Sequence, residues 1–265
     1  MRIVVLIKQV PETKNVRMDE ATGTVIREGV ESIINPLDLY AIELALLLKE
    51  TSDAEVIGLS MGPPKAEIAL KEAIAMGVDS GVLISDRVFG GSDTWATSLV
   101  LAEAVRHIGD IDLILCGERA TDGDTGQVGP GVAAFLDLPV VTYVSRLDHI
   151  EDAFCLVERM VEDGYEQLEC RLPVVLTVVK EVGDPRLPTL RGKQRAKRSQ
   201  IPVWDHKTLA IDSERAGLKG SPTRVVKIFK PQVTRQCQMF TAGSNGQVIE
   251  AVEQLIGHLQ KTERI

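Results

Sequence analysis

The stretch RIVVLI, residues 2–7, opens with one arginine and continues with five apolar, mostly β-branched residues. Strands that are buried on both faces of a sheet have such continuous runs, whereas half-exposed strands alternate apolar with polar residues. We therefore expect residues 2–7 to form a central strand of a buried sheet.

Helices and strands alternate after this first strand. The residues INPLDLYAIELALLLKE (34–50) predict a helix with Asn35 as its N-cap and Pro36 at its first position. Further strands are predicted at 55–61, 80–85 and 111–116, and further helices at 65–76 and 94–108, ending at Gly77 and Gly109. Such an alternation over residues 1–140 is typical of a doubly wound parallel sheet.

The pattern changes from Val140. Four β-rich segments, at 140–150, 153–161, 164–172 and 173–179, follow one another, and we expect them to pair antiparallel along one edge of the sheet. Beyond residue 180 come a basic segment, a weakly patterned stretch at 217–246 and a predicted helix at 247–260. The predicted fold class is α/β, a doubly wound parallel sheet with an antiparallel β-rich edge and a C-terminal arm.

Composition narrows the class of protein. The 265 residues, 44% of them hydrophobic, suffice for a large core, and the net charge of −8 disfavours a broad nucleic-acid-binding surface. The four cysteines show no CxxC spacing and no compact disulfide framework, so we expect reduced, mostly buried thiols. The first apolar stretch is too short for a secretion signal or a membrane span. We expect a cytoplasmic protein with no membrane span and no nucleic-acid partner.

A polar, glycine-rich crossing follows the strand at 111–116. In CGERATDGDTGQVGPG (116–131), Thr125 is expected to cap a helix from Gly126, which leaves amides at 127–129 free for an anion. Asp122 and Asp124 can accept hydrogen bonds from sugar hydroxyls. These features fit a nucleotide, and an Asx turn with a helix cap and no ligand explains the same residues equally well. The dinucleotide and P-loop glycine signatures are absent.

Several long motifs resemble one family. They are KQVP (8–11), REGVESIINPLDLYAIELAL (27–46), MGPPKAEIALKEAIAMGVD (61–79), DLILCGERATDGDTGQVGP (112–130) and LPTLRGKQRAKRSQIPVW (187–204). Together they are similar to the small, or beta, subunit of electron-transfer flavoproteins, over essentially the whole chain. The resemblance implies a heterodimer in which an alpha subunit binds a redox-active FAD and this chain binds an adenine nucleotide.

The resemblance also implies an organisation and a set of site residues. Residues 1–215 would form a nucleotide-binding α/β domain that includes a recognition loop at 184–200, and residues 216–265 an arm and helix packing on the alpha subunit. The nucleotide site would extend over the loop from Asp122 to Ala133, and its residues would be Leu6, Lys8, Asn35, Pro36, Leu37, Asp38, Met61, Asp122, Asp124, Thr125, Gly126, Gln127, Val128, Gly129 and Pro130.

The segment SDRVFGGSDTWATS (85–98) bears on which nucleotide is bound. Family members divide into those with a structural AMP here and electron-bifurcating ones with a second FAD that accepts hydride from NADH. This segment is similar to the bifurcating form, in which the isoalloxazine would lie towards Phe89, Gly90, Gly91, Ser92 and Thr94. Paired glycines allow close backbone approach to a ring, and Asp93 or Thr94 can cap the next helix. A Gly-Gly turn with Phe89 merely packing is the alternative.

The expected function is therefore bifurcation of electrons from NADH. One electron would pass to the alpha-subunit FAD and an acyl-CoA dehydrogenase, and the other to a low-potential acceptor such as ferredoxin or flavodoxin, with activity only in the complex. One alternative is a one-electron carrier with AMP, and another is a free-standing ATP- or AMP-binding stress or sensor protein. Flavins carry this chemistry themselves, so we expect no catalytic side chain and no metal. The four histidines are expected to be solvated or capping.

The basic segment DPRLPTLRGKQRAKRSQ (184–200) surrounds an isolated apolar residue, Leu190, with cations. A charge run is usually a solvated face. The resemblance implies that Leu190, Arg191, Lys193 and Arg195 dock on an acyl-CoA dehydrogenase or a related flavoenzyme, with basic charge steering an acidic partner.

Overall fold

A nine-stranded sheet forms the core of the protein. The computed structural model describes residues 1–12, 17–18, 25–26, 32–151, 153–226, 239 and 243–261. These residues belong to two compact units, Met1–Lys227 and Ile228–Ile265. The second unit contributes the helix α7 (Asn245–Lys261), and the other elements lie in the first. The domain boundary expected at residue 215 stays a prediction.

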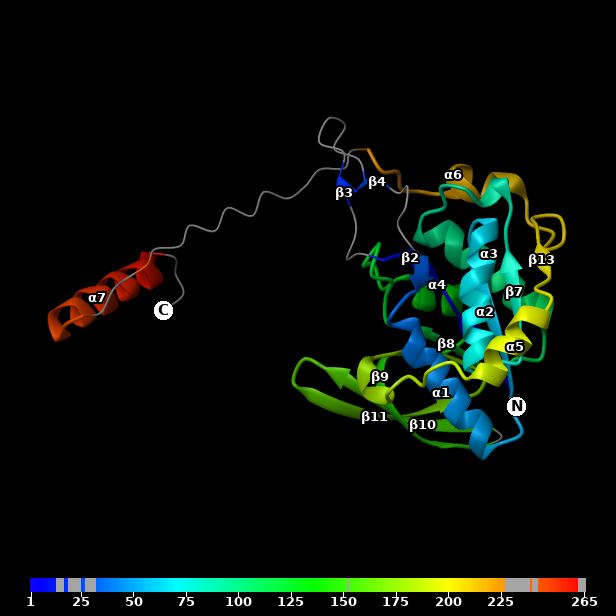
Figure 1. Ribbon diagram of the computed structural model, residues 1–265, viewed down its shortest axis with the longest axis horizontal. Coiled ribbons are helices and arrows are strands. Elements are labelled where there is room, and N and C mark those ends of the chain that lie inside the picture. The colour runs from blue at the N-terminus through cyan, green and yellow to red at the C-terminus, as the bar shows by residue number, and fades with distance from the viewer. Residues whose placement is uncertain are drawn as a thin grey trace. The chain divides into compact units, whose positions relative to one another are not determined.

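The strand order of the sheet is β11-β10-β9-β12-β8-β1-β6-β7-β13, and Figure 1 shows β9, β10 and β11 together at one edge. Neighbours from β9 through β12 to β13 are parallel, whereas β10 is antiparallel to β9 and to β11. The strands are β1 (Arg2–Leu6), β6 (Glu55–Met61), β7 (Ser80–Ile84), β8 (Leu113–Gly117), β9 (Val140–Ile150), β10 (Phe154–Val161), β11 (Gly164–Arg171), β12 (Val174–Val178) and β13 (Val203–Trp204).

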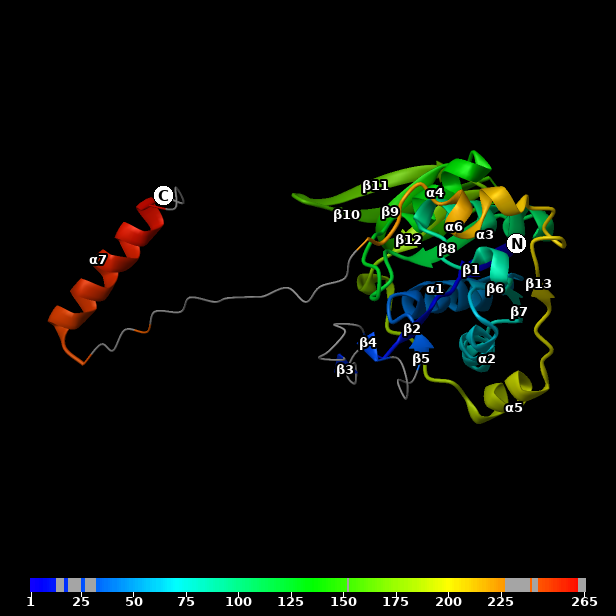
Figure 2. The ribbon, with the colours of Figure 1, turned by 90° about the horizontal axis from the view of Figure 1, so that it is seen from above.

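Helices cover both faces of the parallel strands. Figure 2 shows α1 (Asp38–Thr51) and α2 (Glu67–Met76) on one face and α3 (Thr94–Ile108) and α4 (Val128–Leu136) on the other. The alternation of side chains along β1 explains this arrangement, because Ile3 and Val5 pack with α1 and α2 while Val4 and Leu6 pack with α3 and α4. These four residues are buried, so the predicted central, doubly covered strand is confirmed.

Shorter elements complete the fold. Helix α5 (Leu190–Arg198) follows β12, and the one-turn α6 (Gly217–Gly220) follows β13. Two small antiparallel pairs lie outside the large sheet: β2 (Gln9–Pro11) with β5 (Ser32–Ile34), and β3 (Arg17–Met18) with β4 (Val25–Ile26).

The predicted ends of three helices agree with the structure. Helices α2 and α3 are followed by Gly77 and Gly109 at φ of 145° and 68°, values that favour glycine. Asp93 caps α3 by accepting a hydrogen bond of 3.1 Å from the Ala96 amide. Helix α7 covers the predicted 247–260.

Three sequence predictions were wrong in detail. Strand β12 is parallel to both β8 and β9 and so lies inside the sheet, where its unbroken apolar run VVLTV is buried. Helix α1 begins at Asp38, because Asn35 and Pro36 belong to the preceding turn. The basic segment is not a loop throughout, because Thr189 caps helix α5 by accepting a hydrogen bond from the Gly192 amide.

Candidate functional site

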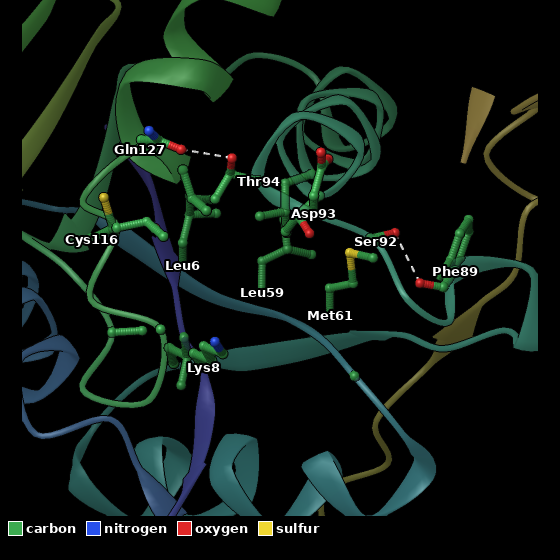
Figure 3. Close-up of a pocket in the computed structure, with 18 of the residues that line it drawn as sticks. Leu6, Lys8, Leu59, Met61, Phe89, Ser92, Asp93, Thr94, Cys116 and Gln127 are labelled. Atoms are coloured by element: carbon green, nitrogen blue, oxygen red, sulfur yellow. Dashed lines mark hydrogen bonds between the residues drawn. The ribbon is translucent and has the colours of Figure 1, made fainter. Parts of the chain in front are cut away.

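A cavity of about 990 Å³ opens at the carboxyl ends of β1, β6, β7 and β8. Parallel strands expose their final residues and the following loops at one edge, which is where α/β sheets usually bind ligands. Figure 3 shows Leu6, Lys8, Leu59 and Met61 projecting from the strand ends into this region. Three loops contribute to the remaining walls: residues 62–64 after β6, the β7–α3 loop (residues 85–93) and the β8–α4 loop (residues 118–127).

Most of the site residues predicted from sequence line this one cavity. They are Leu6, Lys8, Asp38, Met61, Phe89, Gly90, Gly91, Ser92, Thr94, Thr125, Gly126, Gln127, Val128 and Gly129. The others, Asn35, Pro36, Leu37, Asp122, Asp124 and Pro130, lie outside the lining.

The β8–α4 loop presents backbone amides without a partner. Helix α4 begins at Val128, and its N-cap residue Gln127 makes no side-chain capping bond, so the predicted cap by Thr125 is wrong. Within the described residues, no hydrogen bond uses the amides of residues 126–129 as donors. Gly126 has a φ of 61°, which glycine adopts freely. Free amides at a helix N-terminus favour an anion.

Ion pairs flank this loop. The Lys8 ammonium lies 2.7 Å from an Asp122 carboxylate oxygen, and Arg119 Nε lies 3.1 Å from Asp124. The two carboxylates predicted to meet sugar hydroxyls are thus paired with cations. Across the cavity, the Thr94 hydroxyl donates to Gln127 Oε1 at 2.8 Å and joins the two loops.

Asn35 and Asp38 hold the β8–α4 loop from behind. The Asn35 side chain is fully buried, donates to the Arg119 carbonyl at 2.9 Å and accepts from the Thr121 amide at 3.1 Å. It also donates to Asp38, whose carboxyl group accepts from the amides of Lys8 and Gly117. Burial raises the pKa of Asp38 to about 7, against the opposing effect of these donors and of the Lys8 charge.

The β7–α3 loop forms the opposite wall. Phe89 is buried, and Gly91 has a φ of 77°. Asp86 accepts hydrogen bonds from the Val88 amide and from the His206 backbone and ring, the ring nitrogen lying 2.5 Å from Asp86 Oδ2. The bond from the His206 ring is the main reason that the pKa of Asp86 is lowered to about 2. His206 therefore supports the β7–α3 loop through Asp86, whereas the sequence predicted a solvated or helix-capping histidine.

Several lining residues were not predicted individually. They are Ile7, Leu59, Gly62, Pro63, Pro64, Ser85, Asp86, Arg87, Asp93, Thr97, Leu101, Cys116, Gly117, Glu118, Arg119, Ala120 and Gly123. Only their position in the sequence could have indicated them, because most of them come directly after a strand and lie next to residues that were correctly predicted. Leu59, Thr97 and Leu101 carried no separate signal, since apolar and small residues in a strand or helix read equally well as core.

The chemistry of the cavity suits binding more than covalent catalysis. Cys116 lies in the lining, and burial followed by the nearby Asp38 raises the pKa of its thiol, so it stays protonated. Cys155 and Cys170 are free thiols in the sheet edge, and Cys237 lies outside the described residues. Free amides at one end, apolar strand ends in the middle and a glycine pair at the other fit an elongated anionic ligand such as a nucleotide.

The basic segment lies apart from this cavity. Leu187 and Leu190 are 85% and 83% exposed. The guanidinium of Arg195 points inward and donates to the carbonyls of Ile74 and Val78 at 2.7 and 2.8 Å. Arg186 likewise donates to the buried carboxylate of Glu43. These bonds fix both ends of the segment while its two leucines face outward.

No helix in the described ranges has the length and apolarity needed to cross a membrane. The same part of the chain shows no group of three or more His, Cys, Asp or Glu side chains arranged to hold a metal ion. The expected cytoplasmic location stays a prediction.

Comparisons with known proteins agree on one family. The electron transfer flavoprotein domain matches residues 22–209. The chain is 46% identical to an electron transfer flavoprotein subunit beta of Thermoanaerobacterium thermosaccharolyticum, covering 98% of each chain. It is 47% identical to the caffeyl-CoA reductase-Etf complex subunit CarD of Acetobacterium woodii (94% of this chain, 95% of the relative). It is 44% identical to the acryloyl-CoA reductase electron transfer subunit gamma of Anaerotignum propionicum (87% and 89%). The chain belongs to the electron transfer flavoprotein family, as a beta subunit.

Proposed function

We propose that this beta subunit binds FAD in the cavity and works in an electron-bifurcating heterodimer with an alpha subunit. The observation that carries the proposal is a single cavity that joins the free amides of the β8–α4 loop to the Gly90–Gly91 pair. A nucleotide phosphate suits the first end, and a flat ring that needs close backbone approach suits the second.

The phosphate end would rest on residues 126–129. A helix N-terminus favours an anion by about 0.3–1 kcal/mol before individual hydrogen bonds are counted. Lys8 is one of the cations in the lining, and its ammonium is paired with Asp122 at 2.7 Å. Several amides therefore share the phosphate, and no single side chain is expected to decide binding.

The size of the cavity favours FAD over AMP. Its volume of about 990 Å³ is at the upper end of the roughly 300–1,000 Å³ typical of small-molecule sites. An adenosine phosphate bound at the β8–α4 loop would leave the wall formed by Phe89 to Ser92 without a ligand. The apolar strand ends between the two loops, including Leu6, Leu59 and Met61, suit the middle of a longer ligand.

FAD, when bound, supplies the chemistry: acceptance of hydride from NADH and delivery of single electrons to the alpha-subunit FAD and to ferredoxin or flavodoxin. The residues of this chain bind and orient it. The apolar strand ends exclude water from its sides, and the Phe89–Ser92 backbone would contact the ring. NADH-dependent oxidation is expected only in the complete complex.

The partners are inferred from the surface and from the relatives. Leu190, with Arg191 and Lys193 beside it, would dock on an acyl-CoA dehydrogenase or a related flavoenzyme, because an exposed apolar residue among cations fits an apolar pocket with an acidic rim. Two relatives are named as subunits of caffeyl-CoA and acryloyl-CoA reductases. Both names support an acyl-CoA-linked partner.

One alternative remains as an outcome of one experiment. The purified heterodimer is denatured, and the released nucleotides are separated and quantified. Two FAD per heterodimer and reduction by NADH are expected. One FAD and one AMP, without reduction by NADH, would replace the proposal by a one-electron carrier. The stand-alone sensor that the sequence left open is excluded by the beta-subunit relative that matches nearly the whole chain.

A further inference from the structure

The one-turn helix α6 packs directly behind the β7–α3 loop. The Leu218 amide donates to the Gly90 carbonyl at 3.1 Å, and Leu218 is the nearest neighbour that a Cβ on Gly91 would meet. Gly217 lies so close to this loop that a Cβ there would come within 2.0 Å of the Val88 carbonyl oxygen. The backbone at 217–218 therefore supports the wall at 88–91 from its outer side.

Two hydroxyl groups after α6 fasten the end of the same wall. Ser221 Oγ accepts from the Asp93 amide at 2.8 Å and donates to the Gly217 carbonyl at 2.7 Å. The Thr223 amide and hydroxyl both donate to Asp93 Oδ2, at 2.9 and 2.7 Å. Asp93 uses its other oxygen to cap α3, so one carboxylate joins the cavity wall, helix α3 and the 221–223 segment.

The charge state of Asp93 is consistent with this role. Although burial alone would raise its pKa, the hydrogen bonds from Ala96 and Thr223 lower it below its ordinary value. An ionised carboxylate accepts at both oxygens, which matches the donors found on each side.

We propose that Ser221 and Thr223 are positioning residues that hold the Val88–Asp93 wall of the cavity against the bound nucleotide. The wall needs such support because Gly90 and Gly91 have no side chains with which to anchor it. Neither Ser221 nor Thr223 lines the cavity, so they act on the ligand only through the wall. The chain continues from Thr223 towards the C-terminal unit, which makes this wall depend on the residues that lead into the arm.

The inference rests on the proposed function only for the identity of the ligand. Its test uses the purified heterodimer with Ser221→Ala and Thr223→Val combined. Thr208→Val is the matched control, because the Thr208 amide and hydroxyl donate to one Asp205 oxygen in the same way, away from the cavity lining. The single variant Thr223→Ser keeps the hydroxyl and should behave like the wild-type protein.

Two readouts are compared. Amide hydrogen exchange at residues 88–93 should accelerate about tenfold or more in the double variant and stay unchanged in Thr208→Val, since the double variant removes the hydroxyl groups that bond to the Asp93 amide and carboxylate. The dissociation constant of the nucleotide in this subunit should rise about tenfold, with an altered visible circular dichroism spectrum if it is FAD.

The outcomes separate the two proposals. Unchanged exchange at 88–93 together with unchanged nucleotide affinity would overturn the positioning role. Finding AMP in place of a second FAD would overturn the cofactor assignment, while the exchange rates and the AMP affinity would still decide the positioning role. Gly217→Ala provides a second variant, because its φ of 60° and the 2.0 Å contact force the wall to move. Faster exchange at 88–93 is expected there as well.

Discussion

The Asp38 carboxylate accepts a hydrogen bond of 2.7 Å from the Lys8 amide and thereby ties the first turn of α1 to the end of the central strand. Its other oxygen accepts from the Gly117 amide at 3.2 Å and from the buried Asn35 side chain at 2.9 Å. Asp38 therefore fixes the chain just after β1 and the end of β8 at the same point, next to the cavity. Asn35 extends this network of hydrogen bonds to the β8–α4 loop.

Asp38→Asn should disturb this point. An amide has one acceptor oxygen, so its NH₂ group would face at least one of the three donors that now surround the carboxylate. We expect a loss of about 1–3 kcal/mol in the free energy of unfolding and a weaker nucleotide site, because buried donors would lack an acceptor. Urea unfolding and nucleotide titration measure the two effects. Asp53→Asn, at an exposed position on the amino side of β6, is the control and should change neither.

The sequence predicted those parts of the fold that depend on local patterns. The continuous apolar run at 2–7 and the helical periodicity after Asp38 gave the central strand and its covering helix, because burial sets the period of apolar residues. The β8–α4 loop was found because its glycines, carboxylates and threonine suit a strand-to-helix crossing. Thr125 was assigned the wrong role, because helix α4 begins two residues later than expected, after Gln127, and has no side-chain cap.

Contacts between distant segments could not be predicted in this way. The Asp86–His206 pair joins residues 120 positions apart, and Asp93 meets Ser221 and Thr223 at 128 and 130 positions. None of these residues has a local pattern that marks its partner. Strand β12 was misplaced for a related reason, because an apolar run does not specify which strands will flank it.

Stability should depend on pH through Asp86. Its pKa in the folded protein, about 2, lies below the ordinary value of about 3.9, so the His206 contact adds stability that is present above about pH 4 and is lost as the pH falls towards 2. We expect Asp86→Asn to cost about 2 kcal/mol at pH 6 and much less at pH 2.5. Unfolding by urea at both pH values gives the comparison. An equal difference at both would show that the ionised Asp86 carboxylate does not stabilise the fold.

Leu190→Ala should weaken docking of the dehydrogenase by about 1–3 kcal/mol, a range typical of an interface anchor. Leu190 is 83% exposed while Arg195 holds its helix to the end of α2, so truncation should leave the fold intact. Electron transfer to the dehydrogenase is measured at limiting partner concentration, beside reduction by NADH. The control is Val203→Ala, at an exposed position on the edge strand β13. Leu218→Ala would not serve, because Leu218 contacts the β7–α3 loop. Unaltered transfer in Leu190→Ala would exclude the leucine from docking.

Helix α7 should contribute to assembly with the alpha subunit. Val248, Val252 and Leu255 follow a helical spacing and are all at least 43% exposed, as are Ile249 and Ile256. An apolar face of this size usually marks a contact surface. Replacing Val252 and Leu255 by glutamine should raise the dissociation constant of the heterodimer about tenfold or more. Light scattering after size exclusion measures it, and Gln247→Ala, in the same helix, should have little effect.

Gly90→Val should distinguish FAD from AMP in this subunit. Gly90 lines the cavity with a φ of −62°, which other residues adopt without strain, and a Cβ there would meet only the Arg87 carbonyl, at 3.2 Å. The variant should therefore fold, while its isopropyl group occupies space where a ring would approach the backbone. We expect affinity for FAD to fall about tenfold or more, since a ring displaced from close contact loses dispersion and burial together. AMP, bound at residues 126–129, should be unaffected.

Titration of the nucleotide-depleted heterodimer with FAD and with AMP measures both affinities. The control is Gly257→Ala in α7, where a Cβ meets nothing within 4 Å. Equal affinities of wild type and Gly90→Val for FAD would place the ring elsewhere and favour the AMP-binding carrier.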